Sequence, residues 1–253
     1  MKNNILKYFI ILISLLFILI LHLSIIGIET DKFNNQIKNK ISQINENIDI
    51  DLKKIKITLD PLKLKIYAKT VGGTIYFSKR PLALESIKTQ VSLNSLIKNQ
   101  ISSSNIEIIT RSILLKDLIK FIRTINKKPE LFILETIIKK GHVIIDLNLN
   151  VDEYGKIKND YEIEGSIKNA SINFLNKANF NNINFNFNLQ KDNYLLNEIS
   201  FKSEEVNLTS KKLNIIKKKN SFLIDGFVKN DESSLNSNII KLLNLNLDNI
   251  IID

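Results

Sequence analysis

Apolar and polar residues alternate through most of the chain, which is the period of a β-strand with one buried face. The alternation is most regular over residues 143–151, where the odd positions are Val, Ile or Leu and most even positions are Asp or Asn. Similar segments recur about every 10–15 residues up to residue 228, with short turns between them. The pattern predicts an antiparallel meander whose strands have one apolar and one polar face.

The region before this meander predicts a helix followed by a β-hairpin. Apolar residues over 31–48 are spaced three or four positions apart, as in an amphipathic helix. Alternation over residues 48–59 changes parity at residues 53–54, which predicts a bulge in one long strand. An Asp-Pro pair at residues 60–61 predicts a turn, and residues 62–68 predict the returning strand.

A second helix is expected between further strands. Its apolar residues fall on one side over 112–126, whereas residues 130–139 are apolar throughout and ambiguous, with a helix favoured. Residues 94–100 predict a short connection, 152–155 a hairpin turn and 238–243 a last helix. The further strands are expected at residues 74–77, 87–93 and 105–109.

Residues 8–28 are almost uninterruptedly apolar and long enough to cross a membrane. A helix of this length rises about 31 Å, close to the ~30 Å of a bilayer's hydrocarbon core. A secretory signal has a shorter apolar region and a small-residue cleavage site, so an uncleaved anchor is predicted and a cleaved signal is the alternative. Lys2 and Lys7 precede the span while Glu29 and Asp31 follow it, which predicts a cytoplasmic N-terminus.

The one-sided strands restrict the fold class, because a sheet must cover its apolar face with another sheet, with helices or with an apolar ligand. We predict a mainly β fold after the transmembrane helix: an antiparallel meander forming a curved, half-open, groove-like sheet with two short amphipathic helices. A sandwich or barrel whose apolar faces cover each other is the alternative that the pattern leaves open. The expected divisions are an anchor (1–28), a helix-hairpin α/β region (29–128) and a β-groove region (129–253).

Composition argues against an enzyme. The chain has no cysteine, two histidines and seven glycines, which leaves no thiolate chemistry, little imidazole chemistry and no Gly-rich phosphate-binding motif. His142 with Asp146, and Asp160 with Glu162 and Glu164, are the tempting acid–base groups, but they alternate with apolar residues as solvated faces do. No metal or other cofactor is expected, and a membrane-tethered hydrolase lacks a nucleophile–base pair.

The net charge of +10 does not indicate a nucleic-acid partner, because no nucleic-acid-binding motif accompanies it and nearly all the positive charge is lysine. Lysine runs at 211–212 and 217–219 could attract phosphate or anionic lipid headgroups, although solvated charge is the favoured interpretation. No nucleic-acid binding is therefore expected.

Several segments carry a family resemblance in the order in which they occur. The apolar span continues into residues 27–33 (GIETDKF), and the helix after it leads to a strand that closes with residues 59–62 (LDPL). Residues 91–97 (VSLNSLI) precede the strand at 105–109. Together they resemble the AsmA-like family of diderm bacteria, and residues 143–187 are similar to the β-repeat region of its longer members.

The resemblance implies a bridge-like lipid transfer protein, anchored in the inner membrane, whose periplasmic β-groove conducts phospholipids towards the outer membrane. It implies membrane lipids as partners, an unidentified outer-membrane or periplasmic protein, and no catalytic residues. Longer members exceed 253 residues several times over, so an N-terminal fragment of such a member is expected. The alternative is a structural or assembly-scaffold protein of the envelope with a closed core. The residues expected to line the groove are Ile55, Ile57, Leu59, Leu62, Leu64, Ile66, Val143, Ile145, Leu147, Leu149, Ile163, Ile167, Ile183, Phe185, Phe187, Phe201, Phe222 and Ile224.

Overall fold

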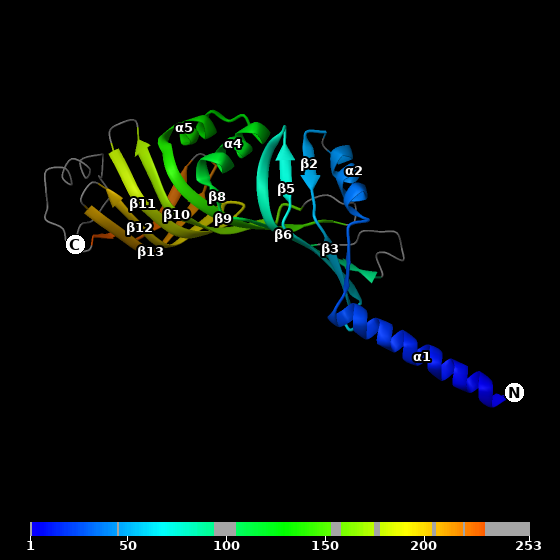
Figure 1. Cartoon of the computed structure of the whole chain (residues 1–253). Helices are drawn as coiled ribbons and strands as arrows, with labels where there is room; N and C mark the ends of the chain where they lie inside the picture. The colour runs from blue at the N-terminus through cyan, green and yellow to red at the C-terminus, as the bar shows by residue number, and fades with distance from the viewer. Residues whose placement is uncertain are drawn as a thin grey trace.

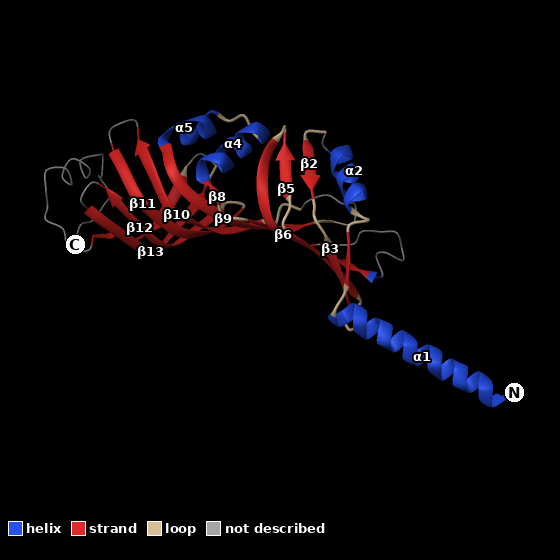
Figure 2. Ribbon diagram, viewed as in Figure 1, coloured by secondary structure: helices blue, strands red, loops and turns tan. Residues whose placement is uncertain are grey.

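A computed structural model describes residues 2–44, 46–93, 105–152, 158–174, 178–203, 206–219 and 221–230. Within these ranges the chain is mainly β, with one large antiparallel sheet that stays open and does not close into a barrel (Figure 2). The predicted fold class is therefore confirmed. The expected connection at 94–100, most of the turn at 152–155 and the helix at 238–243 lie outside the described residues.

The N-terminal helix α1 (Lys2–Ile25) projects from one end of the sheet without packing on it along its length (Figure 1). Its segment Leu6–Ile25 has the length and hydropathy of a membrane span, which is compatible with an anchor or a signal sequence. Just after α1, Gly27 adopts a φ of +74°, and a Cβ there would lie 2.7 Å from the Thr58 Cγ2. Glycine therefore lets the end of α1 sit directly against the sheet.

The strands follow one another across the sheet in an almost unbroken meander, as the alternation predicted. Four shorter strands branch from the main path: β2 (Ile48–Asp51), β5 (Thr74–Phe77), β8 (Ile113–Leu114) and β15 (Lys229–Asn230). The main path is β1 (Ile28–Thr30), β3 (Ile55–Asp60), β4 (Lys65–Val71), β6 (Arg80–Ser92), β7 (Asn105–Thr110), β9 (Ile138–Asn150), β10 (Glu162–Phe174), β11 (Ala178–Gln190), β12 (Asn193–Ser203), β13 (Val206–Lys217) and β14 (Phe222–Gly226).

Two separate covers lie on the apolar face of the sheet, on the inner side of its curve (Figure 1). The first consists of α2 (Asn34–Ile44) with β2 and β5, and encloses a core that contains Ile50, Leu52 and Ile55. The second consists of α4 (Leu115–Ile125) and α5 (Pro129–Ile137), and encloses the larger core around Val143. The apolar face is thus covered in two places rather than along its whole length.

The predicted single strand over residues 48–59 is wrong. β2 pairs with β5, whereas β3 pairs with β1 and β4, so the chain crosses from one pairing partner to another between Asp51 and Ile55. The side-chain amide of Asn34 in α2 fixes the crossing by donating to the carbonyls of Leu52 (2.8 Å) and Lys53 (2.7 Å). The parity change marks this crossing, since Ile50, Leu52 and Ile55 all enter one core.

The returning strand begins at Lys65 and not at residue 62. The Asp60 carboxylate accepts hydrogen bonds from the backbone N–H groups of Leu62 (3.1 Å) and Lys63 (3.0 Å), which closes a tight turn. Leu64 then adopts a φ of +51°. Leu62 is 95% exposed at the tip of this turn, and Leu64 is exposed beside it. Neither can line a groove on the sheet.

A row of β-bulges curves the sheet across four neighbouring strands. Gly141 in β9, Asn169 in β10, Asn182 in β11 and Glu198 in β12 all have positive φ. The pairing of these strands shifts register close to the same positions. Each bulge bends its strand, and the extra residue keeps apolar side chains on the same face at both ends of a long strand.

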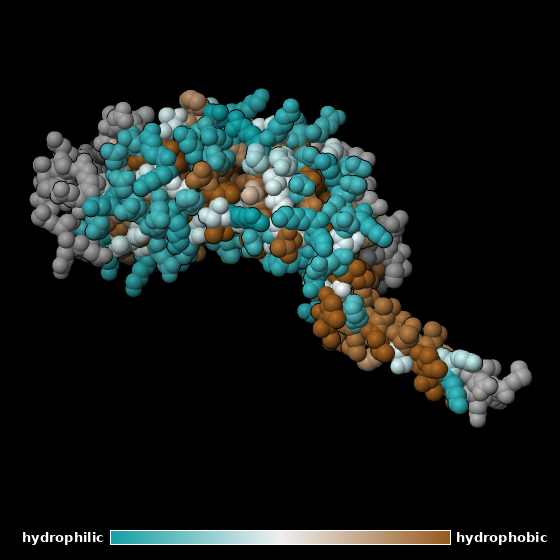
Figure 3. Space-filling view, viewed as in Figure 1, coloured by the Kyte–Doolittle hydropathy of each residue, from teal (hydrophilic) through white to brown (hydrophobic). Residues whose placement is uncertain are grey.

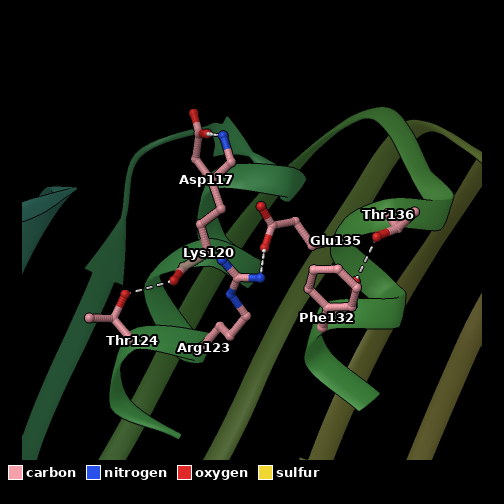
Figure 4. Close-up of polar contacts among 7 residues, drawn as sticks. All are labelled: Asp117, Lys120, Arg123, Thr124, Phe132, Glu135 and Thr136. Carbon is pink, nitrogen blue, oxygen red and sulfur yellow. Dashed lines mark hydrogen bonds and ion pairs between the residues drawn. The ribbon is translucent and has the colours of Figure 1, made fainter. Parts of the chain in front are cut away.

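The second cover is held together by contacts between its two helices (Figure 4). The Arg123 Nη1 lies 2.9 Å from the Glu135 Oε2, and the Arg123 guanidinium lies 5.5 Å from the centre of the Phe132 ring. Charged and aromatic contacts in a partly buried setting favour one fixed arrangement of α4 against α5. The helix that the sequence favoured over 130–139 is confirmed as α5, with Pro129 in its first turn, but it ends at Ile137, and residues 138–139 belong to β9.

Candidate functional site

Eight apolar side chains lie directly opposite one another on eight successive strands of the main path. They belong to β6, β7 and β9 to β14, and the pairing register joins each to the next. Because opposed residues of an antiparallel pair point to the same face, these side chains form one continuous line. This central row consists of Ile87, Ile108, Leu147, Ile163, Leu189, Tyr194, Ile215 and Ile224.

A second line of mainly apolar side chains on the same face joins the central row to the end of α1. It begins on β1, three residues after α1 ends, and continues through β3, β4, β6, β7 and β9. On β6, β7 and β9 the two lines occupy alternate positions and lie side by side. This anchor row consists of Ile28, Ile57, Ala68, Thr89, Ile106 and Leu149.

None of the side chains in either row is fully buried in the part of the chain that the structure describes. Most are half-buried, and the two ends, Ile28 and Ile224, are exposed. Hydrophobic side chains are visible in the middle of the body, between hydrophilic ones above and below them (Figure 3). With ~4.8 Å between strands, the central row extends over about 34 Å.

The opposite face of the same strands is polar and internally hydrogen-bonded. The Asn188 amide donates to Glu162 and to Glu164, both at 2.7 Å, and Gln190 donates to Glu162 at 2.6 Å. These bonds favour the charged carboxylate, so they lower the pKa of Glu162 below its ordinary value. The sheet therefore separates a solvated polar face from the apolar face that carries both rows.

The predicted groove residues divide into four groups. Leu62 and Leu64 lie in the turn described above, and that part of the prediction is wrong. Ile55, Val143 and Phe187 lie on the expected face but inside the two cores, with Ile55 only 3% and Val143 only 1% exposed. Six others are partly buried and pack against these two cores: Ile57, Ile145, Ile163, Ile167, Ile183 and Phe185. The remaining residues lie on the apolar face without being fully buried: Leu59, Ile66, Leu147, Leu149, Phe201, Phe222 and Ile224.

Several members of the two rows were not among the residues that the sequence predicted to line the groove. Ile87, Ile106 and Ile108 belong to strands that the alternation did identify, but their place in a row depends on pairing across strands. Leu189 and Ile215 were likewise assigned to strands without being assigned to the groove. Register could have been derived only from known turn lengths, because the alternation alone does not determine it.

Of the candidate acid–base groups, His142, Asp146, Glu162 and Glu164 lie on the polar face of the sheet. Asp160 precedes β10 and accepts a hydrogen bond from the Asn150 side-chain amide at 3.2 Å. His142 is exposed at the start of the regular part of β9. The part of the chain that the structure describes contains no group of three or more His, Asp or Glu side chains arranged to hold a metal ion.

Asp146 is the polar-face carboxyl whose ionisation opposes folding. Burial, and then the nearby carboxylate of Glu107, raise the pKa of Asp146 above its ordinary value. The charged form is therefore less favourable in the folded chain than in the unfolded one, and the resulting penalty is present above the raised pKa.

We expect Asp146→Asn to increase the free energy of unfolding at pH 7 and to have little effect near pH 3, where the aspartic acid is protonated in both states. Urea unfolding followed by circular dichroism at both pH values measures this difference. Asp225→Asn, on the exposed edge strand β14, is the matched control. An effect of Asp146→Asn that is equal at the two pH values would contradict the electrostatic explanation.

Comparison of the chain with protein-family profiles, with curated proteins and with solved structures found no match.

Proposed function

We propose that this chain is a membrane-anchored lipid-binding protein that holds phospholipid acyl chains against the apolar face of its open sheet. α1 would remain in the inner membrane with its N-terminus in the cytoplasm, and the sheet would extend into the periplasm. The AsmA-like resemblance belongs to the same proposal, as does conduction of phospholipid towards the outer membrane.

The observation that carries the proposal is the continuity of the anchor row and the central row. The anchor row starts beside the end of α1, where a lipid would leave the bilayer. The central row then leads away from α1 over about 34 Å, whereas one acyl chain spans half of a ~30 Å hydrocarbon core, or about 15 Å. Two acyl chains placed end to end would match the length of the row.

The energetics favour apolar chains as the occupant of this surface. Each methylene that leaves water for an apolar contact contributes about 0.8 kcal/mol, so a single acyl chain along the row would be held by several kcal/mol. Because most positions of the rows are Ile or Leu, neighbouring positions would be close in energy, and an acyl chain could move along them in steps. Phosphate headgroups would stay in water at the open side.

Native mass spectrometry of the full chain in a non-ionic detergent tests this proposal. A peptide of residues 1–30, which contains α1 without the sheet, is the control for lipid held by the membrane helix. We expect phospholipid to remain on the full chain after detergent is removed, in excess of any on the peptide. If the full chain and the peptide retained equal amounts of phospholipid, the sheet would bind none, and the proposal would be overturned.

One observation favours the second candidate, an envelope scaffold with a closed core. The α4–α5 cover seals Val143, Ala170 and Phe187 into a conventional protein core, as a purely structural domain would. A scaffold role has no use for the uncovered parts of the two rows, however, and predicts no retained lipid in the same experiment.

A further inference from the structure

Three lysines lie directly opposite one another on three neighbouring strands, on the polar face near α1. Lys56 of β3 pairs with Lys69 of β4, and Lys69 pairs with Lys88 of β6. Like charges in directly opposed positions destabilise a sheet, because their side chains are only about 5 Å apart at Cβ. An anion bound among these lysines would reduce their mutual repulsion.

The neighbouring acids leave this repulsion only partly balanced. Lys88 forms an ion pair with Glu107, and Lys65, on the same face, hydrogen-bonds to Gln90. Among the described residues, Lys56 and Lys69 form no ion pair, even though Glu29 lies opposite Lys56 in the register. The two central lysines of this face therefore keep donors and charge available.

These lysines line an open cavity of about 730 Å³ beside the end of α1. Lys53 and Lys54, from the crossing between β2 and β3, add two positive charges to its wall, and Glu29 adds one negative charge. Thr58 also lines the cavity, and its methyl group lies against Gly27, two residues after α1 ends. The cavity is therefore within a few residues of the point where α1 would leave the membrane.

We propose that this lysine pocket, formed by Lys53, Lys54, Lys56 and Lys69, binds the phosphate of an anionic phospholipid headgroup in the membrane that holds α1. Lysine ammonium groups near an anionic membrane surface are attracted to its phosphates, and the attraction falls off within a Debye length. Lys56 and Lys69 lie on the opposite face of the sheet from the two rows, although Ala68 and Thr89 of the anchor row also line the pocket. The inference rests on α1 staying in the membrane, but not on acyl-chain binding by the rows.

Docking on the membrane can be followed with a single introduced tryptophan, since the chain has none of its own. Tyr67 lines the pocket, so Tyr67→Trp reports on it. The full chain is reconstituted into phosphatidylcholine vesicles that contain increasing fractions of phosphatidylglycerol, and quenching of the tryptophan by acrylamide is measured. We expect phosphatidylglycerol to protect the tryptophan, and the docking constant to fall about 30-fold in K56Q/K69Q, as two lysines near an anionic surface imply.

The matched control, K211Q/K212Q, removes the same charge from β13, far along the strand order from α1, and should change the docking constant less than twofold. Inorganic phosphate added to phosphatidylcholine vesicles tests whether the pocket binds free phosphate instead of a lipid headgroup. Protection by inorganic phosphate equal to that by phosphatidylglycerol would overturn the assignment to a lipid headgroup. No protection by phosphatidylglycerol, or equal losses in the two double variants, would overturn the pocket itself.

Leu147→Asp separates this inference from the proposed function, because Leu147 lies in the central row on the other face. The pocket's response to phosphatidylglycerol should be unchanged in that variant. If Leu147→Asp reduced both lipid retention and the protection of the tryptophan by phosphatidylglycerol, the two faces would not act independently, and the inference would be contradicted.

Discussion

Replacing Leu147 with aspartate should reduce the phospholipid retained by the chain at least tenfold. Leu147 is half-buried in the middle of the central row, between Ile108 and Ile163. An acyl chain lying over an aspartate would have to desolvate its carboxylate or lose contact with the row. Losing two methylene contacts already corresponds to about 1.6 kcal/mol, or more than tenfold in affinity.

Asn148→Asp is the matched control, since Asn148 is the next residue of β9 and belongs to the polar face. It adds the same charge at nearly the same point in the sheet, opposite Glu107 and Glu162, so a loss of stability is expected, but the folded variant should retain as much lipid as the wild-type chain. Lipid phosphorus per mole of purified chain measures the effect, and thermal unfolding by circular dichroism establishes that both variants are folded. Equal retention by folded Leu147→Asp and wild-type chains would contradict a lipid site on this face.

Replacing Leu84 with alanine should lower the free energy of unfolding by about 3–5 kcal/mol. Leu84 is fully buried, with 0% exposure, at the point where β6 leaves β5 and continues into the main sheet. Its N–H donates to the Gly73 carbonyl at 3.0 Å, which fixes the backbone there. The truncated side chain would leave a cavity that this fixed backbone cannot close by moving. We therefore expect a loss in the upper part of the roughly 2–5 kcal/mol found for Leu→Ala in protein cores.

Leu62→Ala is the matched control, because it removes the same atoms from a side chain that is 95% exposed. It should change stability by less than about 0.5 kcal/mol. Urea unfolding followed by circular dichroism measures both variants. Similar losses for the two would contradict the turn that places Leu62 in solvent and the core that contains Leu84.

Alternation along the sequence predicted the strands well because each strand needs only its own residues to be amphipathic. The regular segment from Val143 to Asn150 forms the C-terminal part of β9. The bulges at Asn169 and Asn182 explain why the pattern changes parity inside β10 and β11. The helical spacing predicted α2 and α4 for the same reason, with boundaries a few residues shorter than expected.

The alternation of apolar and polar residues could not predict which strands pair or in which register, because register depends on turns and on tertiary contacts. The change of parity at Lys53 and Lys54 looked like a bulge, and only the pairing of β2 with β5 shows a change of partner. Lys56, Lys69 and Lys88 lie far apart in sequence, so their alignment across three strands could not be predicted from the sequence either. The side chains of the candidate site are thus brought together by the register between strands, and no single segment contains them.

Site-specific photo-crosslinking in native membranes tests the one-sided lipid surface most directly. A small photoreactive leucine analogue is placed at Leu147 or Leu189 in the central row, and at Asn148 or Asn188 as polar-face neighbours. We expect phospholipid adducts, identified by mass spectrometry, at the two row positions and few or none at the two neighbours. Adducts of equal yield on both faces, or none at Leu147 and Leu189, would contradict a one-sided lipid surface.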